Sequence, residues 1–302
     1  MDSVSFGQKL KKELLSRIAK KAEFKRAELF GMLCACDERT SSIIGFSTEN
    51  EGVIAVFSEL MSDVFGILPE LSVVQRRDEV NVCRAQITDS SDILDVNAEL
   101  FFEEEGILRT VQSLSRDELS FFLCGAYLVC GTITDPKKSY HMEFVFKDKT
   151  TARDFCELLS ICSVNSTVSA RKNQYVVYVK QSEGIEDLLI FMGAKLSALE
   201  LMDIKIYKEL RNNTNRRTNC ETANIGKTVA ASAAQIADIN LIFEKGGKES
   251  LPENLRELAE LRLENPDMSL NELGKLLTEP ISRSGVNHRF EKISEIAQKY
   301  KM

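Results

Sequence analysis

The sequence predicts an α+β fold followed by a separate all-α domain. Two observations predict it: an αββ pattern that recurs with a period of about 94 residues, and a helix-turn-helix pattern in the last fifth of the chain. With 302 residues the chain can form two or three domains, each with its own core. We expect a first repeat at 1–110, a second at 111–203, a helical linker at 204–250 and a helix-turn-helix domain at 251–302.

The repeat shows in the order and spacing of its elements. The first copy, which follows an amphipathic basic helix at 6–22, has an apolar helix at 28–36, a strand at 42–46, a helix at 51–65, strands at 71–76 and 80–87, and a helix from Ser90. The second copy has an apolar helix at 121–131, a strand at 140–146, a helix at 150–161, strands at 167–171 and 174–179, and a helix from Gly184. The simplest architecture is a pseudo-twofold pair of α/β halves with antiparallel or mixed sheets.

A glycine occupies the same place in both apolar helices. Gly31 and Gly125 stand at equivalent points of the two copies. A position without a side chain lets two helices approach closely. We therefore expect the halves to pack face to face through these helices.

The C-terminal region carries the signals of two consecutive helices. Ser269 and Glu272 form a capping box, and Leu270, Leu273 and Leu277 follow at helical spacing. The segment 278–280, Thr-Glu-Pro, ends this helix. The pattern is typical of a helix-turn-helix unit.

The second helix of the unit, from about residue 282, has one apolar and one polar face. Val286, Phe290, Ile293 and Ala297 recur at four, three and four residues, which predicts a shared buried face. The polar side chains on the other faces suit the major groove of DNA. We predict that Ser284, Asn287 and His288 contact base edges and that Arg283, Arg289 and Lys292 contact phosphates.

A basic polar segment in the linker is a second candidate for phosphate contacts. Arg211, Arg216 and Arg217 lie within 211–219, where Asn and Thr compete for backbone hydrogen bonds and make a helix uncertain. An ordinary polar linker explains the segment equally well. Gly246 and Gly247 predict a hinge before the last domain, which we expect to begin near Pro252.

The charge of the chain is unevenly distributed. The net charge is −7, but it is +2 from Ile204 onward and −9 before that residue. The predicted DNA-reading end is thus the more basic part. The acidic run Glu103–Glu105 in the first half predicts a solvated face.

The location is expected to be cytoplasmic and, for a DNA reader, associated with the nucleoid. The eight cysteines form no C-x-x-C pair and most stand among apolar residues, which predicts reduced structural thiols. The longest nearly apolar run, 119–133, is too short to span a membrane, and the first residues lack a secretory signal. No cofactor and no metal site is expected.

Several strings resemble the WhiA family of bacterial transcriptional regulators over nearly the whole chain. They lie at 122–128, 131–136, 140–143, 208–212, 215–216, 221–224 and, most specifically, 281–289. The resemblance implies an N-terminal region shaped like a LAGLIDADG homing endonuclease and a helix-turn-helix similar to the promoter-reading domain of sigma factors. It also implies double-stranded promoter DNA as ligand and control of sporulation or cell-division genes, often beside a WhiB-type iron–sulfur partner.

The endonuclease fold needs one acid near the base of each apolar helix to hold divalent cations. In that motif the acid stands five residues after the central glycine, where this chain has Cys36 and Cys130. Asp37 is one position late and is better explained as a helix-end residue, and its counterpart is Gly131. The chain is therefore not expected to be an enzyme, although zinc held by the two thiolates stays a minor alternative.

These observations together predict a sequence-specific DNA-binding transcriptional regulator with a catalytically inactive endonuclease-like platform. Two rival functions stay open. One is an adaptor whose main partner is a protein, such as an RNA polymerase sigma factor or a cell-division component. The other is an active homing endonuclease.

Overall fold

The computed structural model describes residues 4–75, 81–100 and 106–301. Arg76 and Val80 of the predicted strands and the acidic run Glu103–Glu105 lie outside these ranges. The chain divides into two compact units, Met1–Lys208 and Glu209–Met302. Each unit is described separately below.

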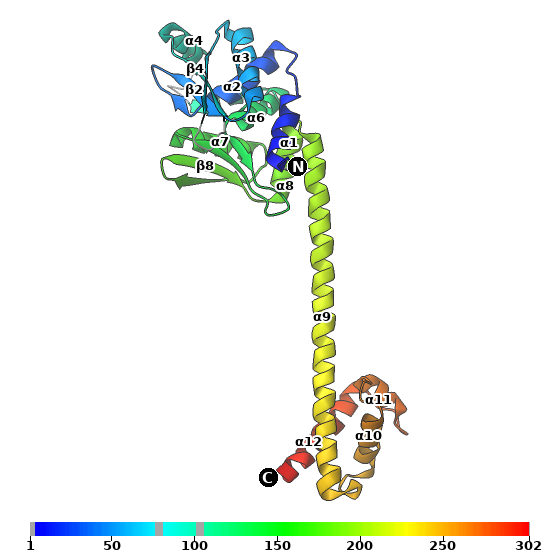
Figure 1. Cartoon of the computed structure of the whole chain (residues 1–302). Coiled ribbons are helices and arrows are strands. Elements are labelled where there is room, and N and C mark those ends of the chain that lie inside the picture. Colours follow the sequence, from blue (N-terminus) through cyan, green and yellow to red (C-terminus); the bar gives the residue numbers. More distant parts are fainter. Residues whose placement is uncertain (1–3, 76–80, 101–105, 302) are drawn as a thin grey trace. The chain divides into compact units, whose positions relative to one another are not determined.

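The first unit contains the two copies of the repeat (Figure 1). The first copy has α1 (Phe6–Leu15), α2 (Ala22–Cys34), β1 (Glu38–Arg39), β2 (Ile44–Thr48), α3 (Glu51–Phe65), β3 (Glu70–Gln75), β4 (Asn81–Ile87), α4 (Ser90–Leu100) and α5 (Gly106–Gln112). The second has α6 (Arg116–Cys130), β5 (Gly131–Ile133), β6 (Met142–Phe146), α7 (Lys149–Ile161), β7 (Thr167–Arg171), β8 (Gln174–Val179) and α8 (Ser182–Phe191).

The two sheets have the same topology. Their strand orders are β1-β2-β4-β3 and β5-β6-β8-β7, and every neighbouring pair is antiparallel. In equivalent central pairs Phe46 faces Ala85 and Phe144 faces Val177. The α+β class and the pseudo-twofold repeat are thus confirmed.

Helices α2 and α6 lie against each other at the centre of the first unit (Figure 1). A Cβ atom on Gly31 would lie 1.9 Å from the carbonyl oxygen of Phe122, and one on Gly125 would lie 2.0 Å from that of Glu28. No side chain fits between the two backbones. This contact confirms the prediction that the two glycines let the apolar helices approach closely.

Several element boundaries differ from those expected from the sequence. The first helix ends at Leu15 rather than at residue 22, because Ser16 takes the C-cap position and its hydroxyl donates to the carbonyl of Glu13. The strand expected from residue 140 starts at Met142. The sequence analysis missed β1 and β5, which are too short to show an alternating pattern.

The segment 211–219, whose helical state was uncertain, is helical. It belongs to α9 (Lys195–Gly246), and the hydroxyl of Thr214 donates to the carbonyl of Leu210 one turn earlier. Its threonine and asparagine side chains therefore do not interrupt the helix. Gly247, which follows α9, has a φ of +74°, a left-handed conformation that suits the predicted hinge position.

The second unit is all helical. After α9 come the short 3-10 turn η1 (Lys248–Ser250), α10 (Glu253–Glu264), α11 (Leu270–Leu276) and α12 (Arg283–Lys301). Ile239 and Ile242 of α9 join a core made by α10, α11 and α12. Lys301 is tied to Asp238 at 2.8 Å, which fixes the end of α12 to α9.

Candidate nucleic-acid interface

The core of the second unit positions helix α12. Val286, Phe290, Ile293 and Ala297 are all buried, and the predicted apolar face of this helix is confirmed. They pack in one cluster with residues of α10 and α11. Because one face of α12 is fixed in this way, the opposite face must point to solvent.

The turn between α11 and α12 is set by local hydrogen bonds. The capping box at the start of α11 is present, with Ser269 Oγ accepting the N–H of Glu272 at 3.3 Å and Glu272 Oε2 accepting that of Ser269 at 2.9 Å. A Cβ on Gly274 would lie 2.5 Å from the carbonyl oxygen of Ile281. The turn can therefore fold back onto α11 only at a glycine.

Arg262 supports the loop before α11 from inside the unit. Its side chain is only 1% exposed, and Nη1 donates to the carbonyl oxygens of Asn265, Pro266 and Met268 at 3.3, 3.3 and 2.7 Å. The guanidinium also lies 5.4 Å from the ring centre of Phe290. The sequence analysis missed this residue, because an arginine on a helix is usually exposed.

The outer face of α12 carries several of the predicted DNA contacts. Arg283, Ser284, Asn287, His288 and Lys292 are all exposed. At 100° per residue, Ser284, His288 and Lys292 lie on the side opposite the buried stripe. These polar groups are presented to solvent by a helix that is anchored from behind.

Glu291 lies among these side chains and was missed by the sequence analysis. Its Oε1 accepts the Nδ2 of Asn287 at 2.8 Å, and its Oε2 lies 3.4 Å from Nδ1 of His288. The spacing of three and four residues on one helix was the signal that could have revealed it. The carboxylate orients the two side chains and can itself accept the N4 amino group of cytosine.

Arg289 lies on the flank of α12, beside α10. It is half-buried, and its Nη1 donates to the carbonyl of Asn254 at 3.2 Å. Arg289, His288 and Lys292 line a groove of 330 Å³ between the start of α10 and α12. The structure thus brings together these three predicted contacts in one concave surface.

The three arginines of α9 do not share a face. Arg211, Arg216 and Arg217 are exposed, and Arg217 pairs with Glu221 at 2.9 Å. Their sequence spacing places them about 100 to 140° apart around the helix. A straight DNA backbone on one side of α9 could reach one or two of them but not all three.

The bases of α2 and α6 carry thiols where the endonuclease motif has acids. Cys36 and Cys130 are free, and Cys36 Sγ lies 3.5 Å from the carbonyl oxygen of Met32. Burial raises the pKa of Cys130 to about 12 and that of Cys36 further still. Both are therefore protonated at neutral pH, a form that is a poor nucleophile. Asp37 lies beyond the last residue of α2 and is exposed, as expected for a helix-end residue.

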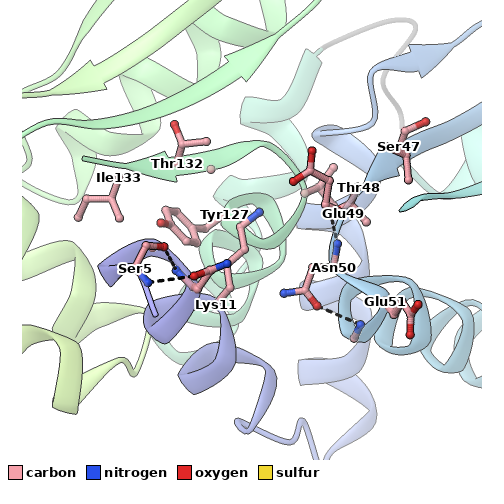
Figure 2. A pocket seen from close by; sticks show the side chains of 16 residues that line it. Ser5, Lys11, Ser47, Thr48, Glu49, Asn50, Glu51, Tyr127, Thr132 and Ile133 are labelled. Carbon is pink, nitrogen blue, oxygen red and sulfur yellow. Dashed lines mark hydrogen bonds between the residues drawn. The ribbon is translucent and has the colours of Figure 1, made fainter. Parts of the chain in front are cut away.

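A cleft of 760 Å³ lies near the base of α6, between α1 and the start of α3 (Figure 2). Lys11 extends into it, its Nζ donates to the carbonyl of Leu128 at 3.2 Å, and burial lowers the pKa of this ammonium. Glu49 and Glu51 also line the cleft. One partly buried ammonium beside two carboxylates does not attract the polyanionic backbone of DNA.

Across residues 4–75, 81–100 and 106–301, no group of three or more His, Cys, Asp or Glu side chains could hold a metal ion. Within the same ranges no helix combines the length and the apolar composition needed to cross a membrane.

Comparison with known proteins identifies the two parts. Residues 119–211 match the WhiA LAGLIDADG-like domain, and residues 214–297 match the WhiA C-terminal HTH domain. A "Probable cell division protein WhiA" of Thermoanaerobacter pseudethanolicus is 39% identical, with 99% of this chain and 98% of that protein covered. The chain belongs to the WhiA family. A WhiA relative with the same description in Clostridium novyi is 38% identical, with 98% of each chain covered.

Solved WhiA structures agree with the fold. The full-length DUF199/WhiA of Thermatoga maritima covers 98% of both chains with a TM-score of 0.59 at 24% identity. The N-terminal LAGLIDADG domain of DUF199/WhiA gives a TM-score of 0.51 at 19% identity, covering 63% of this chain and 91% of that one. These WhiA similarities confirm a LAGLIDADG-like part followed by a helix-turn-helix part.

Proposed function

We propose that this protein is a sequence-specific DNA-binding regulator of transcription that acts at promoters of cell-division or sporulation genes. The observation that carries the proposal is the outer face of α12, where Ser284, Asn287 and His288 are presented by an anchored helix. Relatives named as probable cell division proteins support the choice of target genes. The site of action would be the nucleoid.

Different side chains of α12 serve different purposes in this proposal. Asn287, oriented by Glu291, reads an adenine edge through its amide, because Asn can bond adenine in two places. Lys292 and Arg283 neutralise phosphates and set the position of the helix in the major groove. Arg289 is held partly by Asn254 and contributes a phosphate contact from the flank of the groove.

The first unit serves as a platform without nuclease activity. Its support is the pair of protonated thiols at Cys36 and Cys130, in the positions where the endonuclease chemistry requires carboxylates. A fold can persist after its chemistry has been lost. The platform therefore contributes to binding or to docking of other proteins.

Selection of binding sites from a random duplex DNA pool by the full-length protein tests the proposal. We expect one recurrent motif, whose affinity is then measured by fluorescence anisotropy over a salt series. Asn287→Ala should cost about 1–3 kcal/mol and relax the preference at one base pair. Lys292→Ala should weaken all sequences alike and reduce the salt slope by about 1.

Lys21→Ala in the first unit is the matched control, because Lys21 is exposed and its ammonium contacts only Glu23 and the ring of Phe24 among the described residues. It should leave the selected motif and the affinity unchanged. A pool without any enriched motif, or equal binding by wild type and both α12 variants, would overturn the assignment of α12. Cleavage of the selected duplex in the presence of Mg²⁺ would overturn the non-catalytic platform.

A further inference from the structure

The outward face of the first three turns of α9 is apolar and exposed. Leu196, Leu199, Ile206 and Tyr207 are 72, 58, 56 and 67% exposed. Single exposed apolar residues are common on soluble proteins, but a contiguous row marks an interaction surface. All four residues belong to the first unit.

These four side chains form one stripe with Asp203 at its centre. At 100° per residue, they and Asp203 fall within an arc of about 100°. Leu196, Leu199, Asp203 and Ile206 follow one another at spacings of three, four and three residues, the pattern of a helix that packs along another helix. We call these five residues the α9 stripe.

The opposite face of the same turns is anchored in the first unit. Ala198 and Leu201 are buried in its core. The carboxylate of Glu13 accepts the backbone N–H groups of Leu196 and Ser197 at 2.7 and 2.8 Å, which caps the start of α9. The α9 stripe is therefore held in place before any partner arrives, which lowers the entropic cost of binding.

The charge of Asp203 indicates which partner fits. Asp203 is exposed and has no ion pair or hydrogen bond to the residues that the structure describes. In a parallel pair of two α9 stripes it would face its own copy, and in an antiparallel pair it would lie against Leu199. Both arrangements bury a carboxylate without a cation, which is costly. A second copy of this chain is thus a poor occupant.

We propose that the α9 stripe is the docking site for an amphipathic helix of another protein, with leucine-like residues at spacings of three and four and a lysine or arginine opposite Asp203. The apolar side chains supply the affinity, and the Asp203 pair fixes the register and excludes acidic helices. This partner site is separate from the DNA-reading face of α12 and does not depend on it.

A pair of designed peptides tests the proposal on the full-length protein. Both are fluorescent helices of about 18 residues with leucines at these spacings. One carries Lys and the other Glu at the central seam position. By anisotropy, the Lys peptide should bind wild type about tenfold more tightly than the Glu peptide, because like charges at an interface repel. Asp203→Lys should reverse that preference.

Two substitutions separate the stripe from general surface hydrophobicity. Leu199→Glu should abolish binding of the Lys peptide. Ile161→Glu at the end of α7, where the wild-type side chain is 61% exposed, should leave that binding unchanged. Failure of the Lys peptide to bind, or a peptide preference that Asp203→Lys does not change, would overturn the proposal. Sedimentation showing a wild-type dimer that Leu199→Glu dissociates would assign the stripe to a second copy instead.

Discussion

The contact between α2 and α6 and the outer face of α12 use their residues in opposite ways. In the α2–α6 contact, backbone meets backbone at Gly31 and Gly125, so the fold depends on the absence of a side chain. On α12 the backbone is held from behind and the side chains remain free to vary. The shape of the first region therefore depends on two glycines, whereas the outer side chains of α12 can change without changing the shape of the second.

The same contrast separates the thiols at the helix bases from the polar side chains of α12. Cys36 and Cys130 lie at the ends of the tightly packed helices, and their burial raises the pKa of both thiols. Among the described residues, Glu291 is the side chain that orients Asn287 and His288, and all three are exposed. The thiols are withdrawn from solvent by burial, whereas the polar groups on the surface of α12 are accessible to a ligand.

The largest expected effect comes from filling the α2–α6 contact. Gly125→Ala should destabilise the protein by about 4 kcal/mol, because the new Cβ would overlap the carbonyl oxygen of Glu28 and the two backbones would have to separate. Urea unfolding followed by circular dichroism measures the change.

Gly226→Ala on α9 is the matched control. A Cβ there meets nothing within 4 Å, so the substitution should stabilise the helix by roughly 0.5–1 kcal/mol. Similar effects for the two glycines would show that the close approach of α2 and α6 is not what requires Gly125.

The second-largest expected effect on stability comes from a carboxyl group that is buried beside the α2–α6 contact. Glu28 is 3% exposed, and burial raises its pKa from 4.5 to about 7, against the opposing attraction of Arg17. The folded state therefore holds the proton more tightly than the unfolded state. Between pH 4.5 and 7 the unfolded chain ionises first, so this group lowers stability by about 3 kcal/mol as the pH rises.

Glu28→Gln removes this titration, so the difference in stability between the variant and wild type isolates its contribution. The free energy of unfolding of the variant relative to wild type should rise by about 3 kcal/mol between pH 4.5 and pH 8. Urea titrations at both pH values give the difference. A constant offset between the two proteins across that interval would contradict the assignment.

The smallest expected effect sharpens the comparison inside the second unit. Ser269→Ala removes the cap of α11 and should cost about 1 kcal/mol of stability. Lys292→Ala, on the outer face of α12, should change stability by less than about 0.5 kcal/mol while weakening DNA binding. Thermal unfolding and DNA titration of both variants separate the two roles, and equal stability loss would contradict the division between support and reading face.

Much of the fold could be predicted because it depends on local patterns. The recurrence of Gly31 and Gly125 predicted the paired halves, and the capping box at Ser269 predicted the start of α11. The spacing of Val286, Phe290, Ile293 and Ala297 predicted the buried face of α12. These predictions are confirmed because each pattern indicates which side of a helix or strand is buried.

Other features could not be predicted because they depend on contacts between distant segments. Arg262 looks like a surface residue in the sequence, yet the loop before α11 surrounds its guanidinium with carbonyl oxygens. Glu28 looks like an ordinary helix acid until α6 covers it. The helical state of 211–219 was uncertain because intrinsic propensity alone does not decide it.

The sequence by itself determined the repeat, the two glycines at its centre and the two faces of α12. It also determined the loss of both acids of the endonuclease motif. Each of these features follows from residue type and spacing alone. Only the tertiary structure decided that burial raises the pKa of both thiols, that Asn287 shares Glu291 with His288, and that one face of α9 is left apolar and open. The physical reason is that burial and proximity set protonation, orientation and exposure, and both arise only when distant segments pack together.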